Sequence, residues 1–387
     1  MTDSVFSCLK TAALQTKTRQ PTRPAWLSLS AVLTLYLGTH ALAQAGPADW
    51  IDKDNPDDVR VVTYNMYDSS LFDFDPVFES GTGNILSFYA ANPQLQRLHA
   101  ALNADIYAFQ EVFNPFIDAA EMVSIFNALD PLPDGRSWQA TRGRNQITVT
   151  KLDILQSEIP VPGTQRGIAT SLIDLPDAAG FTHDLYLLNN HYPAGGGNDP
   201  TRQVESDAIV AHLEDARTPG GLFTLPVNTG LVVLGDLNIV ESNDPLDNLL
   251  SGTIVDTDDF GYGSPPDWDG TPLTDVMPFH NDELLEDYTW RSDLSQFDPG
   301  RLDYVLYSDS VLDVANAFIL NTVDLSDQEL AATGLQRSDI LRGDLGEGDF
   351  DHLPIVVDFT ANPVPTPATG LVMAMGVATL GMRRRRD

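Results

Sequence analysis

Short apolar runs alternate with amphipathic segments along most of this chain, and this alternation constrains the fold more than any other feature. The runs are rich in Val, Ile and Leu and predict buried strands, while the segments between them carry apolar residues at helical spacing. The predicted strands are Val59–Asn65, Asp105–Gln110, Ile147–Leu155, Ile168–Leu175, Asp184–Asn190, Leu231–Leu234, Arg301–Tyr307 and Ile355–Phe359. The predicted helices are Asn92–Asn103, Phe116–Leu129 and Thr201–Asp215, and Val240–Thr289 is predicted to be a loop-rich insertion. Many strands with few helices predict one α/β (α+β) domain with two stacked sheets.

The chain is strongly acidic. Its 387 residues include 22 Lys and Arg against 55 Asp and Glu, a formal charge of −33, and residues 44–382 hold 14 basic against 53 acidic side chains. This charge argues against a protein that holds nucleic acid with a basic patch, and it suits a salty or extracellular setting. The one cysteine, Cys8, excludes an intramolecular disulfide framework and a thiolate zinc cluster.

Residues 1–43 have the pattern of an export signal. Four basic residues precede an apolar run, Trp26–Gly38, and Ala41-Leu42-Ala43 then forms a cleavage pattern before Gln44. A retained membrane anchor is the alternative, although the apolar run is shorter than the roughly 20 residues that a membrane span needs. The sequence therefore predicts an exported protein in the periplasm, on the cell surface or outside the cell.

The C-terminal segment 361–387 carries a Pro-rich stretch, fifteen uncharged residues from Ala368 to Met382 and four arginines from Arg383 to Arg386. This order resembles the PEP-CTERM sorting tail, with Thr366 in place of the usual Glu. The resemblance implies contact with export and sorting machinery, a short transmembrane helix as transient inner-membrane anchor, and cleavage. The alternative is an ordinary C-terminal anchor.

Polar residues follow or begin several predicted strands. They are Asn65, Gln110-Glu111, His191, Gly235-Asp236-Leu237-Asn238, Arg301 with Asp303, and Asp351-His352. Polar side chains at consecutive strand ends collect at one rim of a sheet, where active sites are common. We expect a site there.

This set resembles the endonuclease/exonuclease/phosphatase (DNase I-like) superfamily over residues 58–360. TYN, QE, NNH, GDLN, RLDY and DH match in the family's order, and Arg202-Gln203 and Tyr288-Thr289-Trp290 also agree. The departure is Phe350, where the family often has Ser before the Asp-His pair. The resemblance implies a four-layer sandwich of two stacked mixed β-sheets flanked by helices, and hydrolysis of phosphodiester bonds.

Phosphoester hydrolysis places a nucleophile on an anion, and a hard divalent cation such as Mg²⁺ or Mn²⁺ stabilises the added charge through oxygen ligands. Glu111 is the expected principal ligand. Asn65 supplies a neutral amide oxygen, and Asp351 binds directly or through water. The carboxylate-rich loop Asp256–Gly270 is interpreted as a solvated acidic loop, with a structural Ca²⁺ site as the alternative.

Asp303 and His352 are expected to form a carboxylate–imidazole pair, which fixes the ring tautomer and favours the imidazolium. The resemblance implies that His352 contacts the scissile phosphate and that Asp236 is the base or orients the nucleophile. It also implies that Asn238 binds the phosphate oxygens and that His191 is a candidate acid for the leaving oxygen.

Several alternatives stay open for these residues. Asp303 can pair with Arg301 instead, and His191 can be structural. Arg202 is expected to bind phosphate or a backbone carbonyl near the rim, or to be only a charge at a helix start. The remaining histidines are interpreted as structural or surface residues: His99, His183, His212 and His280.

Three classes of function follow. The leading one is an exported Mg²⁺-dependent phosphodiesterase of nuclease type, with a nucleic acid or phospholipid as phosphodiester substrate and no protein partner inferred. A sphingomyelinase-like or small-molecule phosphodiesterase is the second, and lipid binding would require the exposed apolar hairpins Leu71–Phe74 or Phe113–Phe116. The third is a non-catalytic surface-binding protein on the same fold.

Overall fold

The structure, a computed structural model, describes residues 46–67, 70–72, 92–281, 286–293, 295–340 and 351–362. The chain divides into the units Met1–Gln44 and Ala45–Asp387, and every described residue lies in the second. The predicted signal segment, Phe350 and all but the first two residues of the predicted sorting tail therefore lie outside the described residues. The proposed domain limits remain predictions.

Thirteen strands and six α-helices make up the described part of the chain. The strands are β1 (Val59–Asn65), β2 (Ile106–Gln110), β3 (Gln139–Arg142), β4 (Ile147–Thr150), β5 (Ile154–Ser157), β6 (Ala169–Ile173), β7 (Leu185–His191), β8 (Gly230–Asp236), β9 (Thr274–Asp275), β10 (Phe279–His280), β11 (Asp303–Tyr307), β12 (Leu312–Ile319) and β13 (Ile355–Ala361). The helices are α2 (Pro93–Leu102), α3 (Ala119–Leu129), α4 (Asp199–Arg217), α5 (Asp244–Ser251), α6 (Thr257–Phe260) and α7 (Asp327–Thr333).

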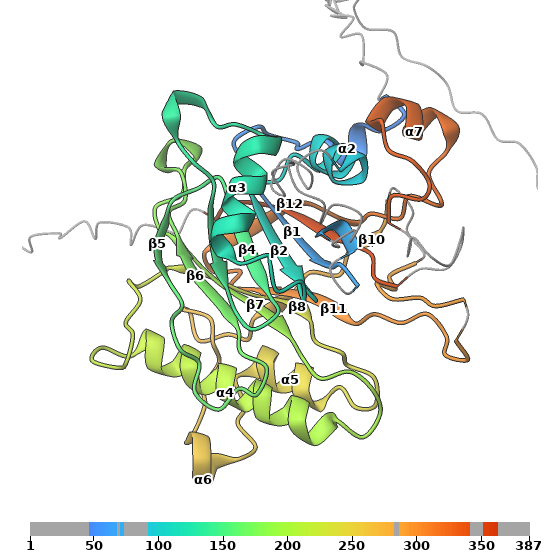
Figure 1. Ribbon diagram of the computed structural model, residues 1–387. Helices are drawn as coiled ribbons and strands as arrows, with labels where there is room; N and C mark the ends of the chain where they lie inside the picture. The colour runs from blue at the N-terminus through green and yellow to red at the C-terminus, as the bar shows by residue number, and fades with distance from the viewer. Residues whose placement is uncertain are drawn as a thin grey trace, which may run out of the picture. The chain divides into compact units, whose positions relative to one another are not determined.

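The strands form two mixed sheets. One has seven strands in the order β10-β12-β13-β1-β2-β4-β3, and the other has six in the order β5-β6-β7-β8-β11-β9. In both sheets the central pair is parallel, β1 with β2 and β7 with β8, and most other neighbours are antiparallel. Residues of β1 and β2 contact β7 and β8, so the sheets face each other, with helices on their outer sides (Figure 1). This is the two-sheet α/β sandwich that the sequence predicts.

The sequence of strand β8 is apolar because both faces of the strand are buried. Val232 and Leu234 belong to the core between the two sheets, whereas Leu231 and Val233 point the other way and belong to the core under α4 and α5. Side chains alternate between the faces of a strand, so a strand covered on both faces has no polar face to show. Strand β8 therefore packs against both cores, one on each of its faces.

Side-chain caps mark the starts of the two helices at the seven-stranded sheet. The Asn92 side chain accepts a hydrogen bond from the Gln94 amide at the start of α2, and Asp118 caps α3 in the same way. An acceptor at this position satisfies backbone N–H groups that the helix leaves without partners. Helix α3 thus starts three residues later than its predicted start, Phe116.

Two parts of the structure differ from the sequence prediction. The predicted strand Ile147–Leu155 is two strands, because the Leu152 amide donates to Thr150 Oγ1 in a turn and the chain passes from the first sheet to the second. The segment Val240–Thr289 contains α5, α6, β9 and β10 in its described part, and α5 packs against α4, so it is more than a loop-rich insertion. Strands β3 and β12 and helix α7 were not predicted.

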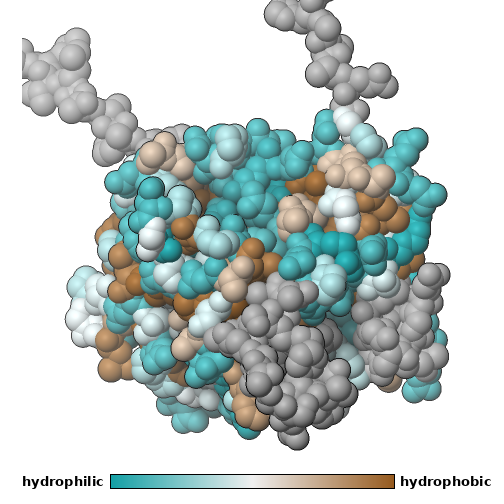
Figure 2. Space-filling view, turned by 45° about the horizontal axis from the view of Figure 1, so that its top comes forward, coloured by the Kyte–Doolittle hydropathy of each residue, from teal (hydrophilic) through white to brown (hydrophobic). Residues whose placement is uncertain are grey.

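Figure 2 shows a face on which hydrophilic and hydrophobic residues are interspersed. Of the helices in the described ranges, none combines the length and apolar character needed to cross a membrane. The predicted transmembrane segment falls in the tail, beyond Asn362, where the description ends.

A buried ion pair joins β1 and β13, which are neighbours in the middle of the seven-stranded sheet. Arg60 in β1 lies opposite Asp358 in β13, and its guanidinium donates to both carboxylate oxygens at 2.6 and 2.7 Å. Arg60 Nη1 also donates to the carbonyl oxygens of Ile51 and Leu102, at 2.7 and 2.9 Å. All three guanidinium nitrogens of this buried side chain therefore have protein acceptors, and the charge is compensated by Asp358.

Asp358→Asn should lower the free energy of unfolding by about 3–5 kcal/mol, because it leaves the buried Arg60 cation without a countercharge. Asp327→Asn is the matched control: this carboxylate is 95% exposed in its pair with Arg337, and its loss should cost at most about 1 kcal/mol. Urea unfolding of both variants measures the difference. Equal losses would show that the buried pair does not stabilise the fold.

Candidate active site

The strand register gathers the predicted site residues. Strands β1 and β2 end together at Asn65 and Gln110, and β7 and β8 end together at His191 and Asp236. Strand β11 runs antiparallel to β8 and begins at the same edge, which places Asp303 opposite Asp236. Asp236 therefore has His191 on one side and Asp303 on the other.

The turns after these strands have unusual backbone conformations. Glu111 follows β2 with φ 58°, and Asn238 follows β8 with φ 48°, both in the left-handed region. Gly235 has φ 120°, and a Cβ there would lie 2.1 Å from the carbonyl oxygen of Asn190. Such conformations are costly for non-glycine residues and concentrate at functional sites. They direct the side chains of Glu111 and Asn238 away from the paths that regular strands would take.

Three donors fix the Asp236 carboxylate. The Asn238 amide N–H donates to Oδ1 at 2.9 Å, while Asn238 Nδ2 and Asn65 Nδ2 donate to Oδ2 at 2.8 and 3.0 Å. Because Asn65 ends β1 and Asp236 ends β8, the Asn65 bond joins the two sheets. The other Asn238 amide hydrogen goes to the Tyr192 carbonyl oxygen at 3.1 Å. Asn238 thus positions Asp236, and phosphate binding by Asn238 stays a prediction.

The surroundings of Asp236 oppose its negative charge. Burial raises its pKa to about 8; the charge of His352 acts in the opposite direction, and the charges of Asp303 and Glu111 add to the rise. A carboxyl group that shares a buried site with other carboxylates holds a proton to unusually high pH. Any cation placed among these acids would lower this pKa and release the proton.

His352 is paired with Asp303. Its Nδ1 lies 2.7 Å from Asp303 Oδ2, while its Nε2 lies 3.4 Å from Asp351 Oδ1 and 3.8 Å from Asp236 Oδ2. Burial alone would lower the His352 pKa, but the charges of Asp303 and Asp236 raise it to about 10. At neutral pH the ring is therefore an imidazolium whose Nε2–H faces the other acids.

The alternative partner of Asp303 is engaged elsewhere. Arg301 donates to both oxygens of Asp275 at 2.6 and 2.7 Å and to the carbonyl oxygen of Val276. The pairing of Asp303 with His352 that the sequence favours is the one in the structure.

His191 is buried and differs in charge from His352. Its Nδ1 lies 2.8 Å from Asn145 Nδ2 and its Nε2 lies 3.3 Å from Arg166 Nη1. Burial lowers its pKa to about 3, with further lowering by the positive charges of Arg166 and His352. The ring is therefore neutral at pH 7, and its 3.7 Å contacts with two carboxylates are not ion pairs.

Arg202 lies apart from this group. It is wholly buried and donates to the carbonyl oxygens of Pro193 and Gly195, at 2.9 and 3.1 Å, and to the carboxylates of Asp199 and Glu241. The sequence predicts that Arg202 contacts either a phosphate or a backbone carbonyl, and the carbonyl contact is present. Through it the guanidinium holds the loop after β7. All three of its guanidinium nitrogens have protein acceptors in this structure, and phosphate binding by Arg202 stays a prediction.

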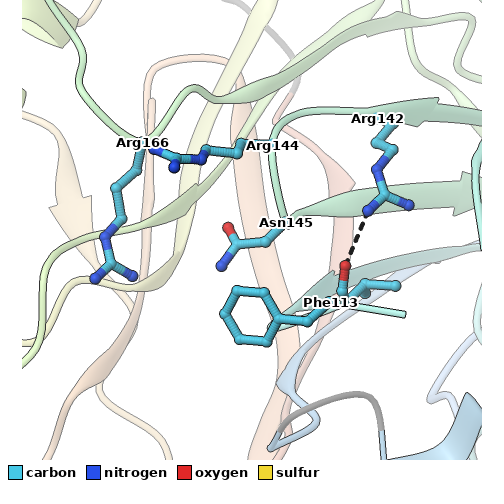
Figure 3. Close-up of a pocket in the computed structure, with 6 residues that line it drawn as sticks. Phe113, Arg142, Arg144, Asn145 and Arg166 are labelled. Carbon is cyan, nitrogen blue, oxygen red and sulfur yellow. Dashed lines mark hydrogen bonds between the residues drawn. The ribbon is translucent and has the colours of Figure 1, made fainter. Parts of the chain in front are cut away.

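A cavity of about 380 Å³ lies next to His191 and was not predicted. Its walls are Val112, Phe113, Arg142, Arg144, Asn145 and Arg166 (Figure 3). Asn145 and Arg166 contact the two ring nitrogens of His191, so the cavity adjoins the active-site group. The signal in the sequence is the short run Arg142-Gly-Arg144-Asn145, whose relation to Arg166 depends on the fold.

The oxygen atoms around Asp236 fit a hard divalent cation. Carboxylate oxygens of Asp236 and Asp303 lie within 4.8 Å of each other and of a His352 ring nitrogen. Oδ1 of Asp303 is buried without a hydrogen-bond partner, although buried polar atoms are normally satisfied. Glu111 and Asp351 add carboxylates beside the two histidines. Carboxylate and amide oxygens are the ligands that Mg²⁺, Mn²⁺ and Ca²⁺ prefer.

Three carboxylates of the acidic loop Asp256–Gly270 accept hydrogen bonds within the chain. Asp256 accepts from the Asp259 amide, Asp267 accepts from Ser310 and Trp268, and Asp269 accepts from Thr271. These bonds stabilise turns within the loop and the contact between Asp267 and Ser310. A structural Ca²⁺ there stays an untested expectation.

No family model matches the chain, and no curated protein matches it. Solved structures do resemble it. D. rerio TDP2 complexed with single strand DNA product has 13% identity and a TM-score of 0.45, covering 78% of this chain and 99% of that one. The human Nocturnin catalytic domain with bound sulfate anion has 14% identity and a TM-score of 0.43, and the match covers 79% of this chain and 95% of that one. An endonuclease/exonuclease/phosphatase from Bacteroides vulgatus has 14% identity and a TM-score of 0.45, and the match covers 79% of this chain and 99% of that one. Likeness this weak carries no argument about chemistry, and the chemistry of the site follows from the chain's own residues.

Asp303→Asn should lower the His352 pKa from about 10 toward or below the ordinary value of about 6.5, because the principal charge that raises it is removed. Since the folded pKa exceeds the unfolded one, protonation of His352 stabilises the fold below about pH 6.5, and this contribution is lost as pH rises through about 10. The free energies of unfolding of wild type and Asp303→Asn should therefore differ most near pH 6 and converge toward pH 10. NMR titration of the imidazole and urea unfolding at several pH values measure both effects. A His352 pKa that stays near 10 in the variant would contradict the pairing.

Proposed function

We propose that this protein is a phosphodiesterase of nuclease type that depends on a divalent cation. The observation that carries the proposal is the buried group Asp236, Asp303 and His352 at the edge shared by both sheets, with Glu111 and His191 beside it. A fixed carboxylate, an imidazolium and oxygen ligands for a cation are the parts that phosphodiester hydrolysis needs. A non-catalytic binding protein has no need of such strongly perturbed pKa values.

In this proposal Asp236 orients the attacking water and accepts its proton. Its carboxylate is already held by three donors, so no reorganisation is needed when the proton arrives. A bound divalent cation would supply positive charge to the phosphate oxygens and keep Asp236 ionised at neutral pH. Glu111, Asp351 and the Asn65 amide oxygen would hold it, together with the unpartnered oxygen of Asp303.

His352 binds the phosphate in this proposal. Its Nε2–H stabilises the charge that develops as water adds to phosphorus and the ester P–O bond breaks, and the leaving oxygen takes a proton from solvent. His352 holds a proton at neutral pH whereas His191 does not. His191 therefore acts as an acceptor that orders its neighbours, and the acid role expected for it from the resemblance is better suited to His352 or to solvent.

A phospholipid phosphodiesterase is the second candidate. The loop after β2 exposes two aromatic side chains, Phe113 at 49% and Phe116 at 57%, and these suit contact with an apolar surface. The other predicted hairpin offers less, because Leu71 and Phe72 are buried and Asp73-Phe74 lie outside the described residues. A panel of DNA, RNA, bis-p-nitrophenyl phosphate and sphingomyelin, each with Mg²⁺, Mn²⁺ or Ca²⁺, distinguishes the classes.

We also propose that the protein is exported and processed at both ends, which rests on the sequence patterns alone. The intact mass of the protein recovered from the periplasm or medium of its native host tests this. A chain beginning near Gln44 and ending near the Pro-rich motif supports processing, and an intact mass from Met1 to Asp387 contradicts it.

Glu111→Gln should reduce turnover by orders of magnitude and weaken the dependence on divalent cation, because a carboxylate ligand becomes a neutral amide. The fold should survive, since Glu111 lies in a turn at the rim and not in the core. Asp313→Asn, which alters an exposed carboxylate on β12, is the control and should keep full activity. Hydrolysis of bis-p-nitrophenyl phosphate across a Mg²⁺ and Mn²⁺ series measures the effect. Undiminished hydrolysis by wild type after exhaustive chelation would refute the metal-dependent mechanism.

A further inference from the structure

Basic side chains are scarce in this protein, and the structure neutralises most of them. Within the described part of the chain, nine of thirteen Lys and Arg side chains lie within 4.0 Å of a carboxylate. The four others are Arg136, Arg142, Arg144 and Arg166. Three of these four line one cavity, the one beside His191. The charges of Asp118 and Glu205 act on Arg142 and Arg166, but no ion pair within 4.0 Å holds any of the three in the described part of the chain. In so acidic a chain, such a cluster of cations forms a local region of positive potential.

The three arginines differ in what they touch. Arg142 donates to the carbonyl oxygens of Val112 and Ile117, so it holds the loop that carries Phe113. Arg144 is exposed, with one long contact of 3.4 Å to the Gln165 carbonyl oxygen, and Arg166 reaches His191 at 3.3 Å. Figure 3 shows Arg144 and Arg166 on one side of Asn145 and the Phe113 ring beside it. Neither Arg144 nor Arg166 is thus held in an ion pair within the described part of the chain, although Glu205 lies near enough to Arg166 for their charges to interact.

The composition of the cavity selects its ligand. Two guanidinium groups without carboxylate partners favour an anion with several oxygens, and the planar guanidinium suits phosphate in particular. The half-exposed Phe113 ring offers an apolar face on which a planar base can stack. The cavity volume of about 380 Å³ lies within the range of roughly 300–1,000 Å³ found for small-molecule sites.

We infer that this cavity is a subsite for a second phosphate of the substrate, next to the scissile one, with the adjoining base against Phe113. The inference rests on the proposed function, in which the scissile phosphate binds at the group Asp236 and His352. His191 lies between that group and the cavity. The inference restricts the substrate class to nucleotides or nucleic-acid strands that carry a further phosphate, and it disfavours lipid-like diesters that have only the scissile phosphate.

The test compares thymidine dinucleotides with and without a 5′-phosphate, TpT and pTpT, as substrates of the purified full-length protein with Mg²⁺ or Mn²⁺. Wild type should prefer pTpT in kcat/KM by about tenfold or more, chiefly through a lower KM, as expected for one additional charge-assisted contact. Arg144→Ala should reduce this preference about tenfold, and Arg144→Lys should keep part of it because the charge remains. Arg136→Ala, which removes a cation outside the cavity, should keep the preference.

A wild-type preference close to one, or an unchanged preference in Arg144→Ala, would overturn the subsite. A 5′-phosphorylated octathymidylate identifies the source of the phosphate: a higher kcat/KM per bond than pTpT indicates a strand, and an equal value indicates a small nucleotide. Both results keep the second phosphate as the recognised group.

Calorimetry separates this inference from the proposed function. In EDTA, thymidine 3′,5′-bisphosphate should bind wild type more tightly than thymidine does, and Arg144→Ala should lose that difference. This holds even if no phosphodiester in the panel is hydrolysed, in which case the proposed function fails and the subsite stands. Equal affinities for the bisphosphate and the nucleoside, or equal bisphosphate affinity in Arg144→Ala, overturn the subsite whatever the enzyme's activity.

Discussion

The position of β8 between β7 and β11 determines the arrangement of the candidate active-site residues. Its parallel register with β7 places His191 beside Asp236, and its antiparallel register with β11 places Asp303 on the other side. The strand is apolar on both faces, so a shift by one residue would leave its polar end in a core and separate all three groups. Burial of β8 therefore supports both the stability of the molecule and the alignment of its chemistry.

Charge distribution is the second constraint. The Asp236 group gathers carboxylates in a buried place, where their mutual repulsion raises the Asp236 pKa and where a cation would be stabilised. One side chain away, Arg144 and Arg166 form a positive region with no acidic partner within ion-pair distance in the described part of the chain. Neighbouring regions of opposite charge suit a substrate with two phosphates, one held through a cation and one held by arginines. The uncompensated groups and the left-handed turn at Glu111 cost stability, a common exchange at functional sites.

Much of the fold was predictable because its signals are local. Periodicity and helix caps mark α2 and α3, and continuous apolar runs mark β1 and β8, since each of these features depends on neighbours within a few residues. Strand β12 was missed because much of its length is partly exposed and its sequence, LDVANAFI, includes three helix-compatible alanine and asparagine positions. The break between β4 and β5 was missed because nothing local distinguishes a strand that bends from one that changes sheet.

The sequence by itself determined which strand ends carry the candidate site residues. Short motifs that follow or begin strands contain all of them: Asn65, Glu111, Asp236, Asp303 and His352. Only the tertiary structure decided which charges remain available for a ligand. The arginines nearest to the motifs in sequence, Arg202 and Arg301, pair with acids of other segments, Glu241 and Asp275. Those that line the cavity come from the end of β3 and from two loops, and in the described part of the chain they have no carboxylate within ion-pair distance. Ion pairing depends on distances of a few ångströms between residues far apart in the chain, and those distances exist only once the two sheets have packed together.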